Sequence, residues 1–208
     1  GDSITKIAKA KVGIIKKNVP AIISIQSAVV RKIIEEKCKE TCSKAIWSEE
    51  SFTVSNSRKS IIQKDSNRNI EFPFPNLTGN HQVSNAMTAI SALTHLNIPE
   101  KYICEGLKST YWPARLQKIK NGSLYKLIKS YNMKNQLWID GGHNEDASIQ
   151  LKNSISFENK KHLHIIYGSL RNKDHKSFLS NLVDVASSLS VVDIKNQPSS
   201  LLQPVAVS

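Results

Sequence analysis

Residues 140–144 of the chain, Asp-Gly-Gly-His-Asn, combine an acid, two glycines and two further polar side chains. They follow an apolar run, Leu-Trp-Ile, which is typical of the end of a buried strand. In open parallel sheets, ligands bind at the carboxyl ends of the strands, and glycines let a ligand approach the backbone closely. This segment therefore predicts a binding site that includes Asp140, although a turn capped by an aspartate would have the same residues.

A second polar cluster, Leu-Thr-Gly-Asn-His-Gln-Val-Ser-Asn, occupies residues 77–85. Its polar residues crowd the first turn of a strongly patterned helix, where free backbone N–H groups attract anions. Ordinary helix capping by Asn80 explains the same cluster equally well. We therefore keep both interpretations, an anion site and a plain helix start.

Arg115 lies in a third cluster, Trp-Pro-Ala-Arg-Leu at residues 112–116. The Tyr-Trp-Pro sequence that begins at Tyr111 breaks the preceding helical pattern and is expected to mark a domain boundary. An arginine directly after such a rigid turn can hold a phosphate with its planar guanidinium group. The competing interpretation is a structural salt bridge, which is the commoner role of a single arginine between two domains.

An α/β framework is expected to position the first domain's polar cluster. Residues 20–25 are a short apolar run bounded by proline, which predicts a buried strand, and residues 26–40 have apolar side chains at helical spacing. A strand followed by an amphipathic helix is half of a βαβ unit. Residues 44–77 consist of short alternating pieces that predict antiparallel hairpins. Helices are predicted from Asn80 to about Leu96 and again from Pro99.

A second α/β region is expected after Arg115. The predicted strands are residues 137–140, 162–167 and 189–194. The predicted helices lie between them, one from about residue 145 and one over residues 174–187. Three strands that alternate with two helices predict the beginning of a parallel sheet. Such a sheet is thin and has an exposed last edge, so we expect the chain to be cut short at its C-terminus.

The composition excludes several classes of protein. The chain has 208 residues, of which 39% are hydrophobic and 22% charged, a balance typical of globular proteins. No apolar run approaches the roughly 18 residues that a membrane-spanning helix needs. The three cysteines, Cys38, Cys42 and Cys104, are too few for a disulfide framework and indicate a reducing, cytoplasmic location. A zinc site is disfavoured because no second pair of ligands follows Cys38 and Cys42.

The net charge of +12 has two explanations. One is an electropositive surface for nucleic acid or for an anionic small molecule. The other is a general bias toward lysine, because Lys, Ile, Asn and Ser are all abundant. Since the lysines are spread along the chain without a block of five or six, the sequence favours the general bias.

Five segments together carry a resemblance to a known family. In order they are GDSITKIAKAKVGIIK at the start of the chain, LTGNHQVSNAMTA, YWPARLQ, LWIDGGHN and YGSLRNKD. No single segment is specific, but their combination and order resemble the folylpolyglutamate synthase/dihydrofolate synthase family, a branch of the Mur ligase superfamily. The resemblance covers residues 1–174, which is most of the chain.

The resemblance implies an ATP-dependent amide ligase of folate metabolism. ATP would phosphorylate a carboxylate of dihydropteroate or of a folate glutamate tail, and the amine of L-glutamate would attack the acyl phosphate to give an amide, ADP and phosphate. ATP and Mg²⁺ would be the cofactors, because such catalysis depends on positioning and on neutralising phosphate charge. By the same resemblance Asn85, Arg115 and Asp140 would contact the nucleotide, with His143 close by. Lys11 matches a lysine that is carbamylated in the family.

The sequence also departs from the family pattern. No G-x-x-x-x-G-K-[ST] motif occurs in the 208 residues, so the family's phosphate-binding loop is expected upstream, as are its Mg²⁺ ligands. Ala10 replaces a usual Glu, Val12 replaces Ala, and Ala114 replaces a glycine before the arginine. The stretch from Arg115 to Asp140 is longer than in many members, which suggests an added hairpin.

The expected fold is therefore α/β in two parts. Residues 1–111 would form the back half of a Mur-ligase-type central ATP-binding domain, and residues 112–208 an incomplete Rossmann-like C-terminal domain. Two functions remain open. The first is a fragment of a ligase whose substrates would be L-glutamate and dihydropteroate or a folate. It would be either one piece of a split enzyme that needs its N-terminal half or the remnant of a degraded gene, and we expect it to be inactive alone. The second is a non-catalytic basic binding module for nucleic acid or a partner protein. Nucleic acid is disfavoured because aromatic residues make up only 6% of the chain.

Overall fold

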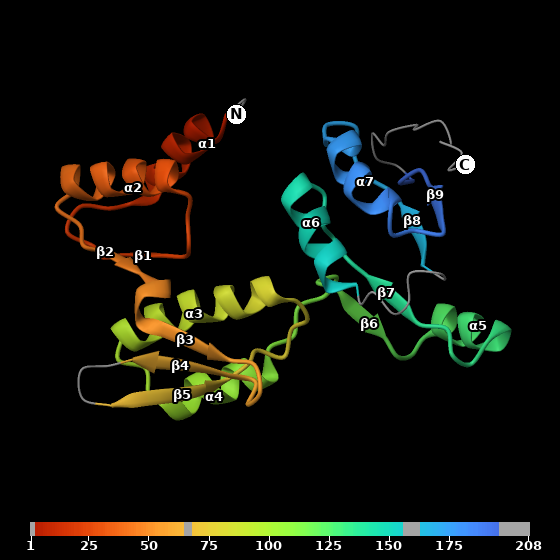
Figure 1. Cartoon of the computed structure of the whole chain (residues 1–208), viewed down its shortest axis with the longest axis horizontal. Coiled ribbons are helices and arrows are strands. Elements are labelled where there is room, and N and C mark those ends of the chain that lie inside the picture. Colours follow the sequence, from red (N-terminus) through yellow and green to blue (C-terminus); the bar gives the residue numbers. More distant parts are fainter. Residues whose placement is uncertain (1–2, 65–67, 156–162, 196–208) are drawn as a thin grey trace. The chain divides into compact units, whose positions relative to one another are not determined.

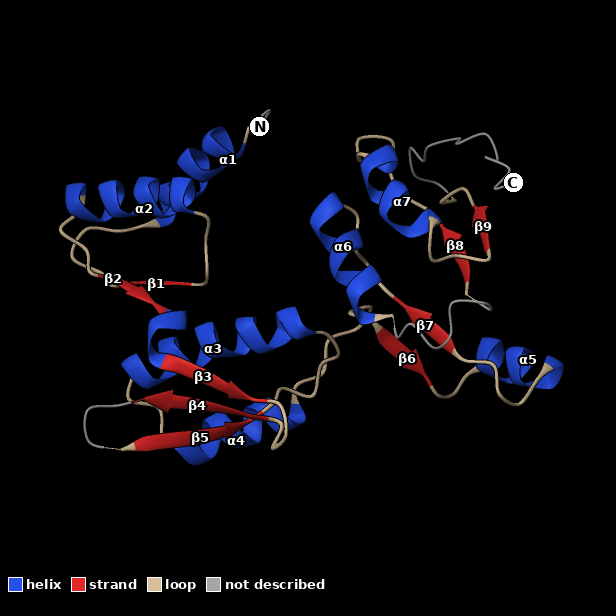
Figure 2. Cartoon of the chain, in the orientation of Figure 1, coloured by secondary structure: helices blue, strands red, loops and turns tan. Residues whose placement is uncertain are grey.

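The computed structural model describes residues 3–64, 68–155 and 163–195 (Figures 1 and 2). The chain divides into two compact units. Unit 1 comprises Gly1–Asn76 and His81–Thr110, and unit 2 comprises Leu77–Asn80 and Tyr111–Ser208. No helix in the described ranges has both the length and the hydropathy required to cross a membrane.

The first layer of unit 1 is a βαβ unit. Strand β1 (Ala21–Ile23) pairs in parallel with β2 (Ala45–Trp47), and helix α2 (Ala28–Glu40) connects them. The predicted strand and helix are thus confirmed, but the prediction of hairpins throughout residues 44–77 is wrong at β2. A parallel partner for β1 is possible there because α2 returns the chain to the start of the sheet.

Helices α1 and α2 bury the small core of this layer. Ser3 caps α1 (Ile4–Lys11) by accepting a hydrogen bond from the Lys6 N–H, and a short 3-10 turn, η1 (Val12–Ile14), follows. The core consists of Ala8, Ile23, Val30, Ile34, Cys38 and Trp47. The α2 residues in this set recur at intervals of four, which is the spacing of one helix face.

The second layer of unit 1 is an antiparallel sheet with two helices on one face. Its strands are β3 (Phe52–Ser55), β4 (Ser60–Lys64) and β5 (Asn69–Pro73), in that order, so the hairpins predicted here are confirmed. The 3-10 turn η2 (Ser48–Ser51) links this sheet to β2. Helices α3 (Asn80–His95) and α4 (Glu100–Ser109) pack on the sheet through a core of Phe52, Ile61, Phe72, Ala86, Ile90, Ile103 and Leu107. Both helices begin within a residue of their predicted positions.

Unit 2 begins with an antiparallel pair of strands that a helix interrupts. Strand β6 (Gln117–Ile119) pairs with β7 (Leu137–Ile139), and α5 (Ser123–Tyr131) lies between them in the chain. The stretch from Arg115 to Asp140 thus contains an antiparallel strand pair, but a helix joins the two strands in place of the turn of the expected hairpin. This connection was not predicted, although the sequence of α5 has an apolar stripe at helical spacing, Leu124, Leu127, Ile128 and Tyr131, none of which the fold buries.

The rest of unit 2 is a helix pair over a short parallel sheet. Helices α6 (Glu145–Ser154) and α7 (His175–Val183) pack with β8 (His164–Tyr167) and β9 (Ser188–Val191) around Tyr167, Phe178, Leu182 and Val185. The start of the expected strand, His162, lies outside the described residues. The prediction of one parallel sheet of three strands is wrong for the described part of the chain. There β7 pairs only with β6, because residues 117–119 supply an antiparallel partner that we had not assigned.

Candidate functional site

The carboxylate of Asp140 joins two loops of unit 2. Its Oδ2 accepts a hydrogen bond from the Leu116 N–H (2.7 Å), and its Oδ1 accepts one from the Gly142 N–H (2.7 Å). The Gly141 N–H donates to the Ala114 carbonyl (2.8 Å), which closes the connection from the other side. Asp140 therefore holds the Trp-Pro-Ala-Arg-Leu loop against the Gly-Gly-His-Asn loop, as the interpretation of a capping aspartate requires. Each carboxylate oxygen retains a second lone pair that can accept a hydrogen bond from a ligand.

Glycine is required at one position of this junction. A Cβ atom at Gly142 would lie 2.8 Å from Asp140 Oδ1 and 2.9 Å from Ala147 Cβ, closer than packed atoms approach. At Gly141 the nearest atom to such a Cβ would be the Ala114 carbonyl oxygen at 3.5 Å, an ordinary contact. Within the chain, the structure therefore requires glycine at position 142 and not at position 141; close approach of a ligand to either glycine stays a prediction.

The backbone on both sides of Arg115 is left-handed. The φ angles are +55° at Ala114 and +42° at Leu116, a region that costs a residue with a side chain of the order of 1 kcal/mol. A glycine at position 114, which the family pattern contains, would avoid that cost. The Ala114 N–H donates to Gln117 Oε1 (3.0 Å), and Gln117 Nε2 donates to the Tyr111 hydroxyl (3.1 Å). These bonds and Asp140 keep the loop in its strained conformation.

Arg115 itself is exposed and has no hydrogen bond, ion pair or ring contact with any other residue that the structure describes. The structural salt bridge considered from the sequence is therefore not present among these residues. A guanidinium group without a protein partner, on a loop that is fixed at both ends, can bind an anion without first breaking an ion pair and without ordering the loop backbone.

His143 lies next to this loop at the start of α6. Its Nδ1 is 3.1 Å from the Gly141 carbonyl oxygen, to which a protonated Nδ1 donates. In that tautomer the Nε2 atom of the neutral ring is an acceptor. Asn144 caps α6, because its Oδ1 accepts from the Ala147 N–H (2.9 Å). Arg115, Asp140 and His143 thus belong to one pair of hydrogen-bonded loops.

Asn85 and Lys11, the other two predicted site residues, belong to unit 1. Asn85 is exposed on α3, and its Nδ2 donates to Oε1 of the buried Gln82 (3.2 Å). The Nε2 of Gln82 is 2.8 Å from His81 Nε2, and His81 Nδ1 is buried without a partner among the described residues. Lys11 is exposed at the end of α1. The structure therefore brings three of the five predicted residues together and leaves Asn85 and Lys11 on separate elements.

The segment Tyr-Gly-Ser-Leu-Arg-Asn-Lys-Asp ends at the cap of α7. Asp174 accepts hydrogen bonds from the Ser177 N–H (3.0 Å) and the Ser177 hydroxyl (2.6 Å). These bonds favour the carboxylate and lower the pKa of Asp174 below its usual range. The segment's last acidic side chain therefore has a structural role at a helix start.

The described residues offer no magnesium site of their own. They contain no group of three or more His, Cys, Asp or Glu side chains that could hold a metal ion. Asp140, the acid nearest to Arg115 in the hydrogen-bonded loops, already accepts two backbone hydrogen bonds. The described residues therefore contain no preformed cluster of side chains for the Mg²⁺ that the resemblance implies.

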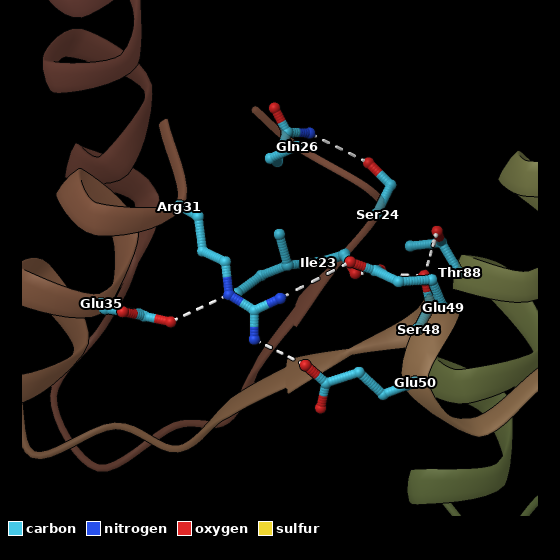
Figure 3. Close-up of polar contacts among 9 residues, drawn as sticks. All are labelled: Ile23, Ser24, Gln26, Arg31, Glu35, Ser48, Glu49, Glu50 and Thr88. Carbon is cyan, nitrogen blue, oxygen red and sulfur yellow. Dashed lines mark hydrogen bonds and ion pairs between the residues drawn. The ribbon is translucent and has the colours of Figure 1, made fainter. Parts of the chain in front are cut away.

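A second arginine, Arg31 of α2, is bound on several sides by its own unit (Figure 3). Its Nε and Nη2 atoms lie 3.0 Å from Glu35 Oε1 and 2.5 Å from Glu50 Oε1, and Nη1 lies 4.0 Å from Glu49 Oε1. Its Cζ atom is 4.1 Å from the centroid of the Trp47 ring. The hydrogen bonds to Glu50 and Glu35 raise the pKa of Arg31. Arg31 therefore connects α2 to β2 and η2 and is a structural residue.

Comparison with known proteins gives relatives of a single kind. No family model matches the chain. It is 28% identical over 167 residues to the probable dihydrofolate synthetase of Schizosaccharomyces pombe, covering 78% of this chain and 37% of that protein. It is 26% identical over 212 residues to the folylpolyglutamate synthase of Lacticaseibacillus casei, covering 97% and 47%. The chain thus spans less than half the length of these relatives.

Solved structures agree in fold. The folylpolyglutamate synthase of Mycobacterium tuberculosis, complexed with ADP and AMPPCP, matches 96% of this chain and 46% of its own with a TM-score of 0.76 and 19% identity. The chain therefore shares the α/β fold of that folylpolyglutamate synthase. Its sequence is similar to those of folylpolyglutamate and dihydrofolate synthases, which confirms the resemblance seen in the sequence.

Two features of the site escaped the sequence. Tyr111 and Gln117 brace the Arg115 loop, and neither residue type signals that role. Leu116 contributes its backbone N–H rather than its side chain, and a leucine in the sequence does not indicate a left-handed backbone. The replacement of a family glycine by Ala114 was the one available hint of an unusual backbone here.

Proposed function

We propose that this chain supplies the nucleotide-binding loops of an ATP-dependent ligase that adds L-glutamate to dihydropteroate or to a folate. The observation that carries the proposal is Arg115, which is exposed and unpaired among the described residues on a loop that Asp140 fixes. The names of the sequence relatives supply the substrate class, and the complex of the structural relative with ADP and AMPPCP supplies the nucleotide.

In this proposal the reaction has two steps. A substrate carboxylate oxygen attacks the γ-phosphorus of ATP, the bond to the bridging oxygen breaks, and an acyl phosphate and ADP form. The glutamate amine then attacks the acyl carbon, loses a proton, and displaces phosphate as the amide forms. Both steps develop negative charge on phosphoryl oxygens, which a positioned cation stabilises.

The residues of unit 2 would bind and orient the nucleotide. Arg115 would donate its guanidinium N–H groups to phosphate oxygens. Asp140 would accept from a nucleotide hydroxyl through a lone pair that the backbone N–H groups leave free, and His143 would lie beside it. Because the loop is already fixed by four hydrogen bonds, little ordering is required when the nucleotide binds.

We also assign roles to two residues of unit 1. Asn85 would contact the nucleotide from the first part of α3, and Lys11 would act as a carbamylated, anionic group near the transferred phosphate. We further propose that residues 1–111 correspond to the back of the Mur ligase central domain and residues 112–208 to the C-terminal domain. The phosphate-binding motif, which these 208 residues lack, would come from a separate N-terminal half.

A reconstitution experiment tests the proposal. The chain would be mixed with a separately produced N-terminal part of the L. casei enzyme, the part that this chain does not match, and complex formation would be checked by gel filtration. We expect ADP release that requires both L-glutamate and a folate or dihydropteroate, and none from either part alone. A stable complex that releases no ADP under these conditions would contradict the proposal.

A further inference from the structure

The segment between Glu105 and Asp140 has an unusual charge. It contains Lys108, Arg115, Lys118, Lys120, Lys126, Lys129 and Lys134 and not one acidic residue. These 34 residues therefore contribute seven of the twelve net positive charges of the chain. A general lysine bias does not explain the local absence of acids, since the chain has 17 of them elsewhere.

Four of these lysines line one pocket in unit 2. The pocket has a volume of about 520 Å³, within the range of small-molecule sites, and lies between the end of β6, helix α5 and the segment before β7. Its cationic lining residues are Lys118, Lys120, Lys129 and Lys134. The side chains of Asn135, Gln136 and Tyr125 add hydrogen-bonding groups.

No carboxylate neutralises these four lysines among the residues that the structure describes. Lys129 Nζ donates to the Met133 carbonyl oxygen, which fixes the turn after α5. Lys118 Nζ lies 5.5 Å from the centroid of the Trp138 ring, a cation–π contact. The ammonium groups of Lys120 and Lys134 have no polar partner in the described structure, and the Lys134 backbone N–H donates to Asn132 Oδ1 (2.8 Å). Two ammonium groups are thus available to a ligand, and two more add to the positive potential.

The pocket is separate from the Arg115 loop. At one end of the β6–β7 strand pair Gln117 pairs with Ile139, and Asp140 and Leu116 adjoin this end. At the other end Ile119 pairs with Leu137, and the pocket adjoins that end. The two ends differ by two residues along each strand, roughly 7 Å. A ligand in the pocket therefore has its own set of cationic partners.

We propose that this pocket binds a small anion that carries several carboxylate or phosphate groups. Like charges that line a cavity repel one another, so a multivalent anion gains more there than a single charge does. Flexible lysines favour such a ligand without selecting a planar geometry, unlike arginines. The inference does not depend on the proposed ligase activity, because no residue of the Arg115 loop lines the pocket.

Calorimetric titration of the full chain tests the proposal with two probes, tripolyphosphate and linear tetraglutamate, at low ionic strength. We expect at least one probe to bind with a Kd below about 1 mM, and the two arms distinguish phosphate from carboxylate ligands. Lys120→Gln and Lys134→Gln should each weaken binding about fivefold to tenfold. Lys126→Gln is the matched control, because Lys126 is exposed on α5 but does not line the pocket. Its effect should be less than twofold.

Three results would overturn the proposal. They are the absence of binding by both probes, an equal loss with Lys126→Gln, and a loss with Arg115→Ala as large as that with Lys134→Gln. The last result would place the anion at the Arg115 loop instead. Amide NMR shifts give an independent location, and they should be largest for Lys120, Asn135 and Gln136. All substituted lysines are exposed, so an unchanged melting temperature is expected to confirm that each variant folds.

Discussion

Arg31 in unit 1 and Arg115 in unit 2 have opposite surroundings. Arg31 is held by Glu35 and Glu50, lies near Glu49 and covers the Trp47 ring. Arg115 has none of these contacts among the described residues, although the backbone around it is fixed by hydrogen bonds and is left-handed on both sides. The strain is thus in the backbone that presents Arg115, and the side chain is left for a ligand. In the proposed function, Arg115 thus differs from the structural Arg31 by the protein contacts that its side chain lacks.

Replacing each arginine by alanine should separate the two roles, and this is the largest effect that we expect. In the reconstituted enzyme, Arg115→Ala should reduce kcat/KM for ATP by about 2–4 kcal/mol, or roughly 30-fold to 1,000-fold, with little change in melting temperature. Arg31→Ala should lower the melting temperature of unit 1, because three carboxylates lose a common partner. Steady-state kinetics and thermal unfolding measure the two outcomes.

Lys126→Ala controls for the loss of one positive charge in unit 2. It should change kcat/KM by well under 1 kcal/mol, as is usual for a solvated surface residue. Equal losses for Arg115→Ala and Lys126→Ala would mean that positive charge acts diffusely. The contrast between the two arginines would then have no functional meaning.

Gly142→Ala should produce the next largest effect and should be confined to unit 2. The new methyl group would collide with Asp140 Oδ1 and Ala147 Cβ, and we expect a loss of about 2 kcal/mol in the free energy of unfolding. Gly141→Ala is the matched control and should cost far less, since its Cβ would have ordinary contacts. Hydrogen exchange that resolves unit 1 from unit 2 measures both, and similar losses for the two variants would refute the assignment of the close contact.

Ala114→Gly should stabilise unit 2 by about 1 kcal/mol. Its φ of +55° is strained for alanine and free of strain for glycine. The same exchange at Ala10, on the exposed side of α1, should destabilise unit 1 by about 0.5–1 kcal/mol, since glycine disfavours a helix. Chemical denaturation of both variants should show changes of opposite sign, and a loss of stability in Ala114→Gly would contradict a strained loop.

The two units should also differ slightly in their response to pH, which is the smallest effect. Hydrogen bonds from Ser177 lower the pKa of Asp174, so unit 2 loses this stabilisation as the pH falls below about 4. Burial raises the pKa of Cys38 in unit 1, so that unit loses stability as the pH rises above about 8.5. Asp174→Asn should flatten the acid side of the stability profile, and Cys38→Ala the alkaline side. Unchanged profiles would show that other titrating groups determine the pH dependence of stability on both the acid and the alkaline side.

The sequence predicted the parts of the fold that depend on strong local patterns. Helix α3 was expected from Asn80 to about Leu96 and ends at His95, because its apolar side chains recur at helical spacing over its whole length. Strands β2 and β6 were missed, since each has only three residues and is recognised by its partner rather than by its own pattern.

The candidate site was predictable to a similar degree. Asp140 and Arg115 stand in motifs whose residue types indicate binding, so they could be selected from the sequence. Their connection could not, because it passes through backbone N–H groups of Leu116 and Gly142 that carry no side-chain signal. The basic pocket was also missed, since its lysines are spaced along 17 residues, 118–134, and gather only when α5 folds between β6 and β7.

The segment of 17 residues from 120 to 136 enters and leaves the fold at one paired position, Ile119 opposite Leu137. Because α5 buries no residue, this segment is a peripheral insertion at the end of the β6–β7 strand pair. The entropy of closing such a loop depends only weakly on its length, and shortening it to about five residues would alter the cost by only about 1 kcal/mol. The insertion can therefore be lengthened, deleted or exchanged while the Asp140 junction stays closed, so its length can change without rebuilding the rest of unit 2.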